Sequence, residues 1–162
     1  MTIPTPAIPS VQMVALKWLG LQIPDLQAGR SLLTPTESWA GDIFATVSMI
    51  PSIPDSYVPV HDEKVQIDVW GRPSPNQQYR GVPKERCNAI VNHLEYLAQH
   101  STPLVIDFPS SNYASVDLSY LEPEEKSLAV AEKPGVSAQV GSATVALSRA
   151  RLTVCFVYKV LI

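Results

Sequence analysis

The stretch Val65-Gln-Ile-Asp-Val-Trp-Gly71 alternates apolar and polar residues and ends at a glycine. A period of two is typical of a β-strand that has one face in the core and the other face outside it. The apolar positions are Val65, Ile67 and Val69, so we expect Asp68 on the opposite face, in contact with solvent or with a partner. This strand is the clearest element of the chain, and its neighbours are interpreted around it.

Further elements flank this strand on both sides. A residue run rich in β-formers lies between Gly41-Asp42 and Pro51, and a polar, turn-rich segment over 71–83 leads into a helix that starts near Pro83. Apolar residues recur along one side of that helix and charged residues along the other. The predicted elements are strands at Ile43–Ile50, Leu104–Phe108 and Ala150–Ile162, and a helix at 84–99.

The two remaining regions are less regular. Residues 1–9 form an expected extended arm because of their prolines, and Ser10 is the expected N-cap of a helix that ends at Gly20. Residues 109–143 are expected to be a loop or hairpin insertion, with a turn at Glu122–Lys126 and short strands at 116–118 and 128–131. The order of elements predicts a single α+β domain over 10–162, with a mainly antiparallel sheet and two main helices packed on it.

Composition indicates a globular chain with a surface poor in charge. The 162 residues suit one domain, and 46% of them are hydrophobic, which is enough for a core. Charged residues are only 17%, below the usual ~25%, and there are 15 prolines. Such a surface often belongs to a subunit of an assembly.

Several classes of protein are disfavoured. The net charge is −3 and no basic run occurs, which argues against a dedicated nucleic-acid-binding module. The first positive charge, Lys17, lies inside the apolar run Val11–Leu19, so we expect neither a signal peptide nor a membrane span, and synthesis in the cytosol. Cys87 and Cys155 lie in apolar patterns and are expected to be reduced core residues.

No pattern of catalytic residues stands out. His61 lies beside Asp62 and Glu63 in an expected loop, where adjacent charged residues are usually just solvated. The sequence around Ser137 lacks the second glycine of a nucleophile elbow and a downstream histidine. Metal-binding and phosphate-binding motifs do not occur. We therefore predict no catalytic residue, no metal and no cofactor, and a protein that is not an enzyme.

Four aromatic and arginine residues are candidates for an interface. Trp70, Arg72, Tyr79 and Arg80 lie in or beside the polar loop, and the sequence shows no obvious partner for them within the chain. These residue types anchor many protein interfaces. The alternative is a loop that packs on its own sheet. The arm, with Pro4 and Pro6, is expected to lie on a neighbouring subunit, because prolines lose little entropy when they become ordered.

The order of these segments resembles the tail terminator family of long-tailed bacteriophages, also called tail-to-head joining or tail completion proteins. The strand V-x-I-x-V-W-G, which runs through a polar loop into an alanine- and leucine-containing helix, is its most telling part. The resemblance covers residues 10–100 and 145–162. The matching segments are 54–62, Val65–Gly71, Glu85–Ala98 and Arg151–Val160.

This resemblance implies a virion protein of the tail or neck. It implies a ring of copies, usually a hexamer, that caps the tail tube, stops its polymerisation and contacts the head connector or completion protein. DNA would pass through such a ring without specific binding, so a neutral or acidic channel wall is expected. The candidate channel-facing residues are Asp62, Glu63, Glu122, Glu124 and Glu125.

Two alternatives stay open. The first is another phage structural subunit, either a head completion (connector) protein or a tail tube protein. The second is a cellular binding domain or an enzyme, which would need a pocket with convergent polar groups.

Overall fold

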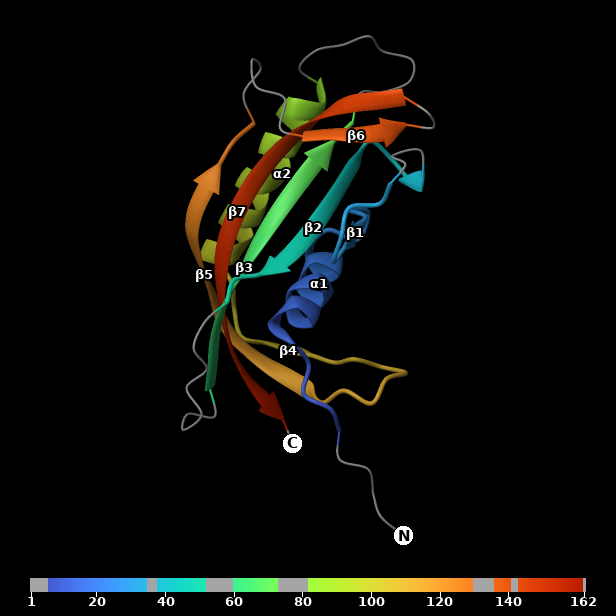
Figure 1. Cartoon of the computed structure of the whole chain (residues 1–162). Coiled ribbons are helices and arrows are strands. Elements are labelled where there is room, and N and C mark those ends of the chain that lie inside the picture. The colour runs from blue at the N-terminus through green and yellow to red at the C-terminus, as the bar shows by residue number, and fades with distance from the viewer. Residues whose placement is uncertain are drawn as a thin grey trace.

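The computed structural model describes residues 6–34, 38–51, 60–72, 82–129, 136–140 and 143–161. Pro4, Tyr79 and Arg80, three of the residues predicted at an interface, lie outside these ranges. The described residues form a mixed α+β fold in which a curled, mainly antiparallel sheet holds two helices (Figure 1). The expected fold class is therefore confirmed.

A curled sheet forms the body of the molecule. Its described strands are β1 (Ala28–Gly29), β2 (Ile43–Met49), β3 (Val60–Gly71), β4 (Leu104–Ile106), β5 (Ser115–Ser127) and β7 (Ala143–Leu161). They lie in the order β1-β2-β3-β7-β5-β4, and only the β1–β2 pair is parallel. Strand β7 runs through the middle, where Ser148 to Lys159 pair with β3 and Arg151 to Leu161 pair with β5. A further strand, β6 (Val136–Val140), pairs with the start of β7.

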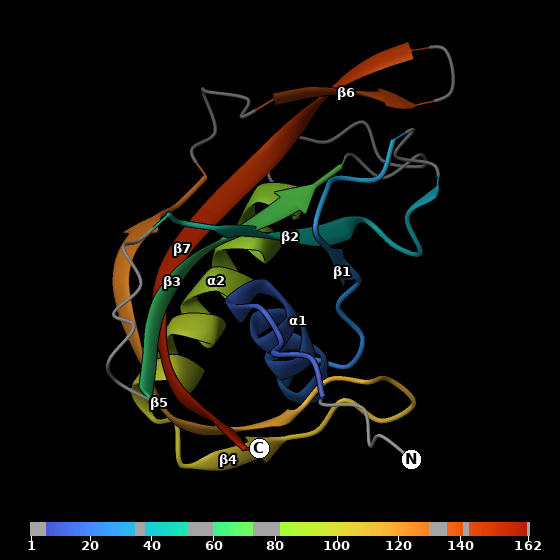
Figure 2. The ribbon, with the colours of Figure 1, turned by 60° about the horizontal axis from the view of Figure 1, so that its bottom comes forward.

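Two helices, α1 (Val11–Gln22) and α2 (Val82–Gln99), lie inside the curl of the sheet (Figure 2). Helix α1 begins where expected, because the Ser10 Oγ accepts a hydrogen bond from the Met13 N–H at 3.3 Å and so caps the first turn. The helix continues past the predicted end at Gly20. The Ile23 N–H still donates to the Leu19 carbonyl at 2.8 Å, so this glycine lies within the helix and does not end it.

The main hydrophobic core lies between the helices and the concave face of the sheet. Trp18 of α1 meets Phe156 of β7 edge to face, with ring centroids 5.7 Å apart. The buried stripe of α2 includes Cys87, Val91 and Leu94, all 0% exposed. Burying one large apolar side chain stabilises a fold by about 1.5–3 kcal/mol, so this layer is the main source of stability. Both cysteines are free and buried, as predicted.

Two acidic segments that we expected in loops or turns lie within strands. His61, Asp62 and Glu63 belong to β3, because its pairing with β7 continues to Val60. The segment Glu122–Lys126 belongs to β5, because a shift of register between Pro123 and Lys126 accommodates the proline, which has no N–H to donate. Most of the stretch 115–127 is thus part of the main sheet, and the expected strand at 128–131 does not form over its described residues, Leu128 and Ala129.

The described end of the N-terminal arm contacts its own chain. The Ala7 N–H donates to the Asn112 carbonyl at 2.6 Å, and the Ala114 N–H donates to the Ala7 carbonyl at 2.9 Å. At Ala7 the arm thus contacts its own chain, and Pro6 beside it is exposed; a contact of the arm with a neighbour stays a prediction. Neither of the two described helices has the length and apolar character that crossing a bilayer requires.

Candidate functional site

The face of the sheet that points away from the helices carries most of the polar residues of the central strands. Asp68, Thr153 and Cys155 are only 4%, 8% and 3% exposed, although neither helix lies on this side. Their register places them on a surface that we call the outer face. It comprises Thr46, Asp62, Lys64, Gln66, Asp68, Trp70, Glu122, Glu124, Arg149, Arg151, Thr153 and Cys155.

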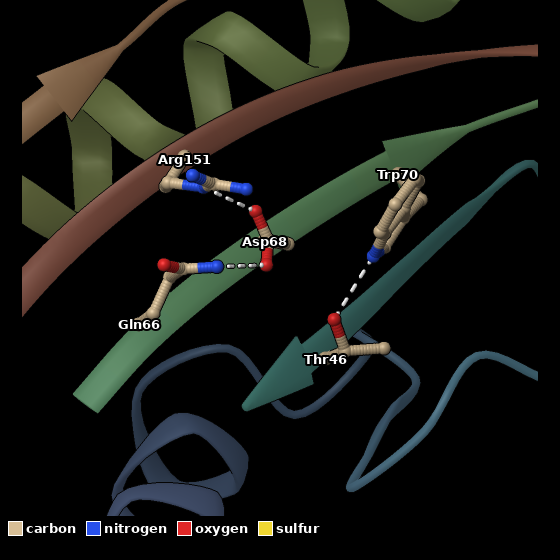
Figure 3. Close-up of polar contacts among 5 residues, drawn as sticks. All are labelled: Thr46, Gln66, Asp68, Trp70 and Arg151. Atoms are coloured by element: carbon tan, nitrogen blue, oxygen red, sulfur yellow. Dashed lines mark hydrogen bonds and ion pairs between the residues drawn. The ribbon is translucent and has the colours of Figure 1, made fainter. Parts of the chain in front are cut away.

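Asp68 is bound from both sides within the chain. The Arg151 Nε donates to its Oδ1 at 2.9 Å, and the Gln66 Nε2 donates to its Oδ2 at 2.9 Å (Figure 3). Arg151 lies directly opposite Asp68 in the β3–β7 register. The expectation that Asp68 contacts solvent or a partner is therefore wrong. Its carboxylate is buried, and the guanidinium provides the compensation that a buried charge needs.

Trp70 also has partners within the chain. Its Nε1 donates to the Thr46 Oγ1 at 2.9 Å (Figure 3), and the guanidinium of Arg149 lies 5.3 Å from the ring centroid. At 8% exposure, Trp70 packs in a second small hydrophobic cluster with Trp39, Phe44 and Leu147. The predicted interface role of Trp70 assumed that it has no partner within the chain, and that assumption is wrong.

Arg72 joins the same cluster from its edge. Its guanidinium lies 5.8 Å from the Trp39 ring, and its Nε lies 3.5 Å from the Asp42 Oδ1. The Arg72 N–H donates to the Asp42 carbonyl at 2.9 Å. The alternative that we left open, a segment packed on its own sheet, describes both Trp70 and Arg72. A contact of either residue with a neighbouring subunit stays a prediction.

Three of the five candidate channel residues lie together on the part of the outer face that β3, β5 and β7 form. Glu124 pairs with the Lys64 Nζ at 3.0 Å, and Glu122 lies opposite Cys155 in the register. The Cys155 thiol donates to the Asp62 Oδ1. Burial and this hydrogen bond raise the pKa of Cys155 to about 12. The thiol is therefore neutral at physiological pH and is a poor nucleophile.

Glu63 lies apart from these acids, on the side of Tyr158. It accepts a hydrogen bond from the Tyr158 Oη at 2.6 Å, and burial followed by this bond raises the pKa of that phenol. His61 stacks on Tyr158 with ring centroids 5.0 Å apart, and its Nδ1 is 4.0 Å from the Glu63 Oε2. Glu125 is exposed in the irregular part of β5. The five acids thus do not form one lining.

A pocket of about 300 Å³ lies where the ends of α1 and α2 face β4 and β5. Its lining is mostly apolar, and the stacked rings of Tyr96 and His100 are among its polar residues. Gln22, Ser101 and Thr102 complete its polar lining, and the Ser101 Oγ accepts a hydrogen bond from the Leu121 N–H at 3.0 Å. Among the residues that the structure describes, no three His, Cys, Asp or Glu side chains could together hold a metal ion.

Arg149 and Arg151 were not predicted as members of the outer face. Both alternate with the apolar Ala150 and Leu152, so a period of two already placed them opposite the core. Their partners could not be inferred, because Asp68 lies 83 positions away from Arg151.

Comparisons with known protein families, with curated proteins and with solved structures found no match to this chain.

Proposed function

We propose that this protein is a structural subunit of a bacteriophage virion, a tail terminator whose copies form a ring. The ring would cap the tail tube, stop its polymerisation and join it to the head connector. The observation that carries this proposal is the two-stranded extension made by β6 and the start of β7, which we call the ribbon (Val136–Val140 and Ala143–Leu147).

The ribbon leaves the body of the sheet. Residues Ala143 to Leu147 pair with β6, whereas the pairing of β7 with β3 begins only at Ser148 (Figure 2). Among the described strands, none pairs with the remaining edges of the ribbon. Isolated two-stranded ribbons are marginally stable in water, so a contact with another chain would stabilise this one.

The residues of the ribbon suit such a contact. The segment 136–147 contains no charged residue and no proline, which are the devices that usually protect open strand edges. The register pairs Val136 with Leu147 and Ala138 with Val145, which are all apolar residues. Leu147 is 0% exposed in the second hydrophobic cluster, so the ribbon starts from a packed base.

Other observations agree with a phage tail protein. The strand that carries the resemblance, V-x-I-x-V-W-G, is the end of β3 and is followed by α2. A charged fraction of 17% suits a subunit with much of its surface in contact with neighbours. The ribbon also fits a tail tube subunit, which is the second candidate, because tube proteins carry a long hairpin.

Electron microscopy of the purified protein, alone and with unfinished tail tubes of the same phage, tests the proposal. We expect rings that bind one end of each tube and stop its growth. Long tubes made of this chain alone would instead support the tube subunit. Particles that remain single and leave tube growth unchanged would overturn the proposal.

A matched pair of variants links the ribbon to assembly. Val145→Lys replaces an apolar residue of the ribbon with a charged one, and Thr144→Lys introduces the same charge at the neighbouring polar residue. We expect Val145→Lys to abolish ring formation and Thr144→Lys to weaken it less. Both should keep the thermal stability of the subunit, since both positions lie in the ribbon, before the part of β7 that pairs with β3.

A further inference from the structure

Three arginines lie near the base of the ribbon. Arg149 and Arg151 follow it directly on β7, and Arg86 lies in the first turns of α2. The Arg86 side chain is 57% exposed, and its Nη1 is 4.0 Å from the Asp42 Oδ2, a distance at the limit of an ion pair. We call Arg86, Arg149, Arg151 and the ribbon the ribbon end of the molecule.

The opposite end of the sheet is rich in acids, although Lys64 and Lys159 lie among them. Asp62 and Glu122 are exposed, and Asp117 lies opposite Lys159 in the register. The nearby ring of Tyr120 is 49% exposed and adds an apolar surface among the acids. We call Asp62, Asp117, Glu122 and Glu124 the acidic end.

The acidic end adjoins an open strand edge. The order of the sheet terminates at β4, which among the described strands pairs with β5 alone. Val105 in the middle of β4 is 52% exposed. An extended segment can add to such an edge through main-chain hydrogen bonds. Figure 1 shows the ribbon and β4 at opposite ends of the molecule. One molecule therefore carries an uncharged ribbon beside arginines at one end and an open edge beside carboxylates at the other.

We infer that copies of this chain associate head to tail, with the ribbon end of one copy docked on the acidic end and the β4 edge of the next. The occupant of each end is thus a second copy. Charge complementarity favours this partner, because Arg86 and Arg149 of one copy would meet Asp62 and Glu122 of the next. Arg151 and Glu124 contribute less, since each already has an ion-pair partner within its own chain, Asp68 and Lys64. A twofold arrangement would bring arginines against arginines, whereas a head-to-tail contact closes into a ring when its rotation allows.

This inference rests on the proposed ring and names the surfaces that close it. A charge-swap experiment tests it with Arg149→Glu at the ribbon end and Glu122→Lys at the acidic end. Each variant alone sets like charges against each other in every contact. In an equal mixture, the altered ribbon end of the first variant meets the altered acidic end of the second, and their opposite charges attract. The unaltered Arg149 and Glu122 meet in the alternate contacts.

We expect each single variant to weaken self-association by about tenfold or more, measured by sedimentation at a series of concentrations. The mixture and the double variant Arg149→Glu/Glu122→Lys should both recover particles of the wild-type size. Arg30→Glu and Asp25→Lys, at exposed positions that belong to neither the ribbon end nor the acidic end as defined, are the matched controls and should assemble normally. If Arg149→Glu unfolds the subunit, as its circular dichroism would show, Arg86→Glu replaces it.

Single variants that assemble like the wild type, or a mixture that does not recover, would overturn the head-to-tail contact. Rings of wild-type protein with no such recovery would leave the proposed function in place and remove only this inference. Recovery of particles that do not stop the growth of tail tubes would support the contact and overturn the tail terminator. A wild-type protein that stays monomeric with and without tubes would overturn both.

Discussion

The two faces of the sheet are built differently. The concave face packs α1 and α2 mainly against apolar positions, such as Ile67, Leu152 and Phe156, each 0% exposed. The outer face buries a small cluster around Trp70 and, beside it, the charged pair Asp68–Arg151. A continuous apolar layer supplies stability, whereas a buried ion pair contributes little net stability, because desolvation offsets its attraction.

This difference indicates a division of roles. The concave face holds the subunit together, and the outer face fixes the positions of the arginines, the carboxylates and the base of the ribbon. Changes on the concave face should therefore unfold the subunit. Changes on the outer face should alter local order and assembly with a smaller effect on folding.

The largest effect is expected for Phe156→Ala. Its ring is fully buried against Trp18, so its removal leaves a cavity in the main core. We expect a loss of about 4 kcal/mol in the free energy of unfolding, measured by urea denaturation. Tyr120→Ala, which truncates a half-exposed ring on the outer side of the sheet, is the control and should change stability by less than about 0.5 kcal/mol. Equal losses would refute the division between the faces.

A smaller loss is expected for Arg151→Met. This variant leaves the Asp68 carboxylate buried without its cation, and we expect a loss of about 2 kcal/mol. The double variant Asp68→Leu/Arg151→Met removes both charges and should recover most of that stability. A double variant that is no more stable than Arg151→Met would mean that the ion pair is a net source of stability. That result would contradict the proposed difference between the two faces of the sheet.

A coupling of about 1 kcal/mol is expected between Trp70 and Thr46. Trp70→Phe removes the indole N–H, Thr46→Val removes the hydroxyl, and a double-mutant cycle isolates the hydrogen bond that joins them. Trp70→Phe should also accelerate amide exchange at Leu147 and Ser148, at the base of the ribbon, because Leu147 packs in the same cluster. Unchanged exchange there would mean that this cluster does not hold the ribbon.

The last effect is confined to alkaline pH. The pKa of both cysteines is raised from 9.0 to about 12, first by burial in each case. The unfolded thiols ionise at lower pH than the folded ones, so this contribution is complete below pH 9 and is lost as the pH rises towards 12. Urea midpoints should fall over this range, and Cys87→Ala/Cys155→Ala should fall less. An equal fall in the double variant would assign the effect to other groups, such as Tyr158.

The concave face was the more predictable of the two. The helical period of Val11, Val14 and Trp18 and the alternation of Val65, Ile67 and Val69 placed these residues in the core, where the structure has them. Such patterns are local, and burial against any apolar surface satisfies them. The predicted N-cap at Ser10 was local in the same sense.

The outer face could not be derived in the same way. Its contacts join Asp62 to Cys155 across 93 positions and Lys64 to Glu124 across another strand, so they depend on a register that sequence alone does not provide. The extent of β5 was missed because Glu122-Pro123 is typical of a turn, and only the local irregularity of the pairing makes it compatible with a strand. The candidate acids Asp62 and Glu122 are exposed, but their grouping on the outer face was not foreseen, and a channel that they would line stays a prediction.

The mass of the particles that this protein forms in solution and on tail tubes decides whether the outer face serves assembly. Native mass spectrometry of the wild-type chain and of Val145→Lys measures it. The proposed function and the ribbon predict closed particles of about six 17.7 kDa subunits for the wild type and single subunits for the variant. A wild-type chain that remains a single subunit in both conditions, or a variant that assembles as well as the wild type, would contradict them.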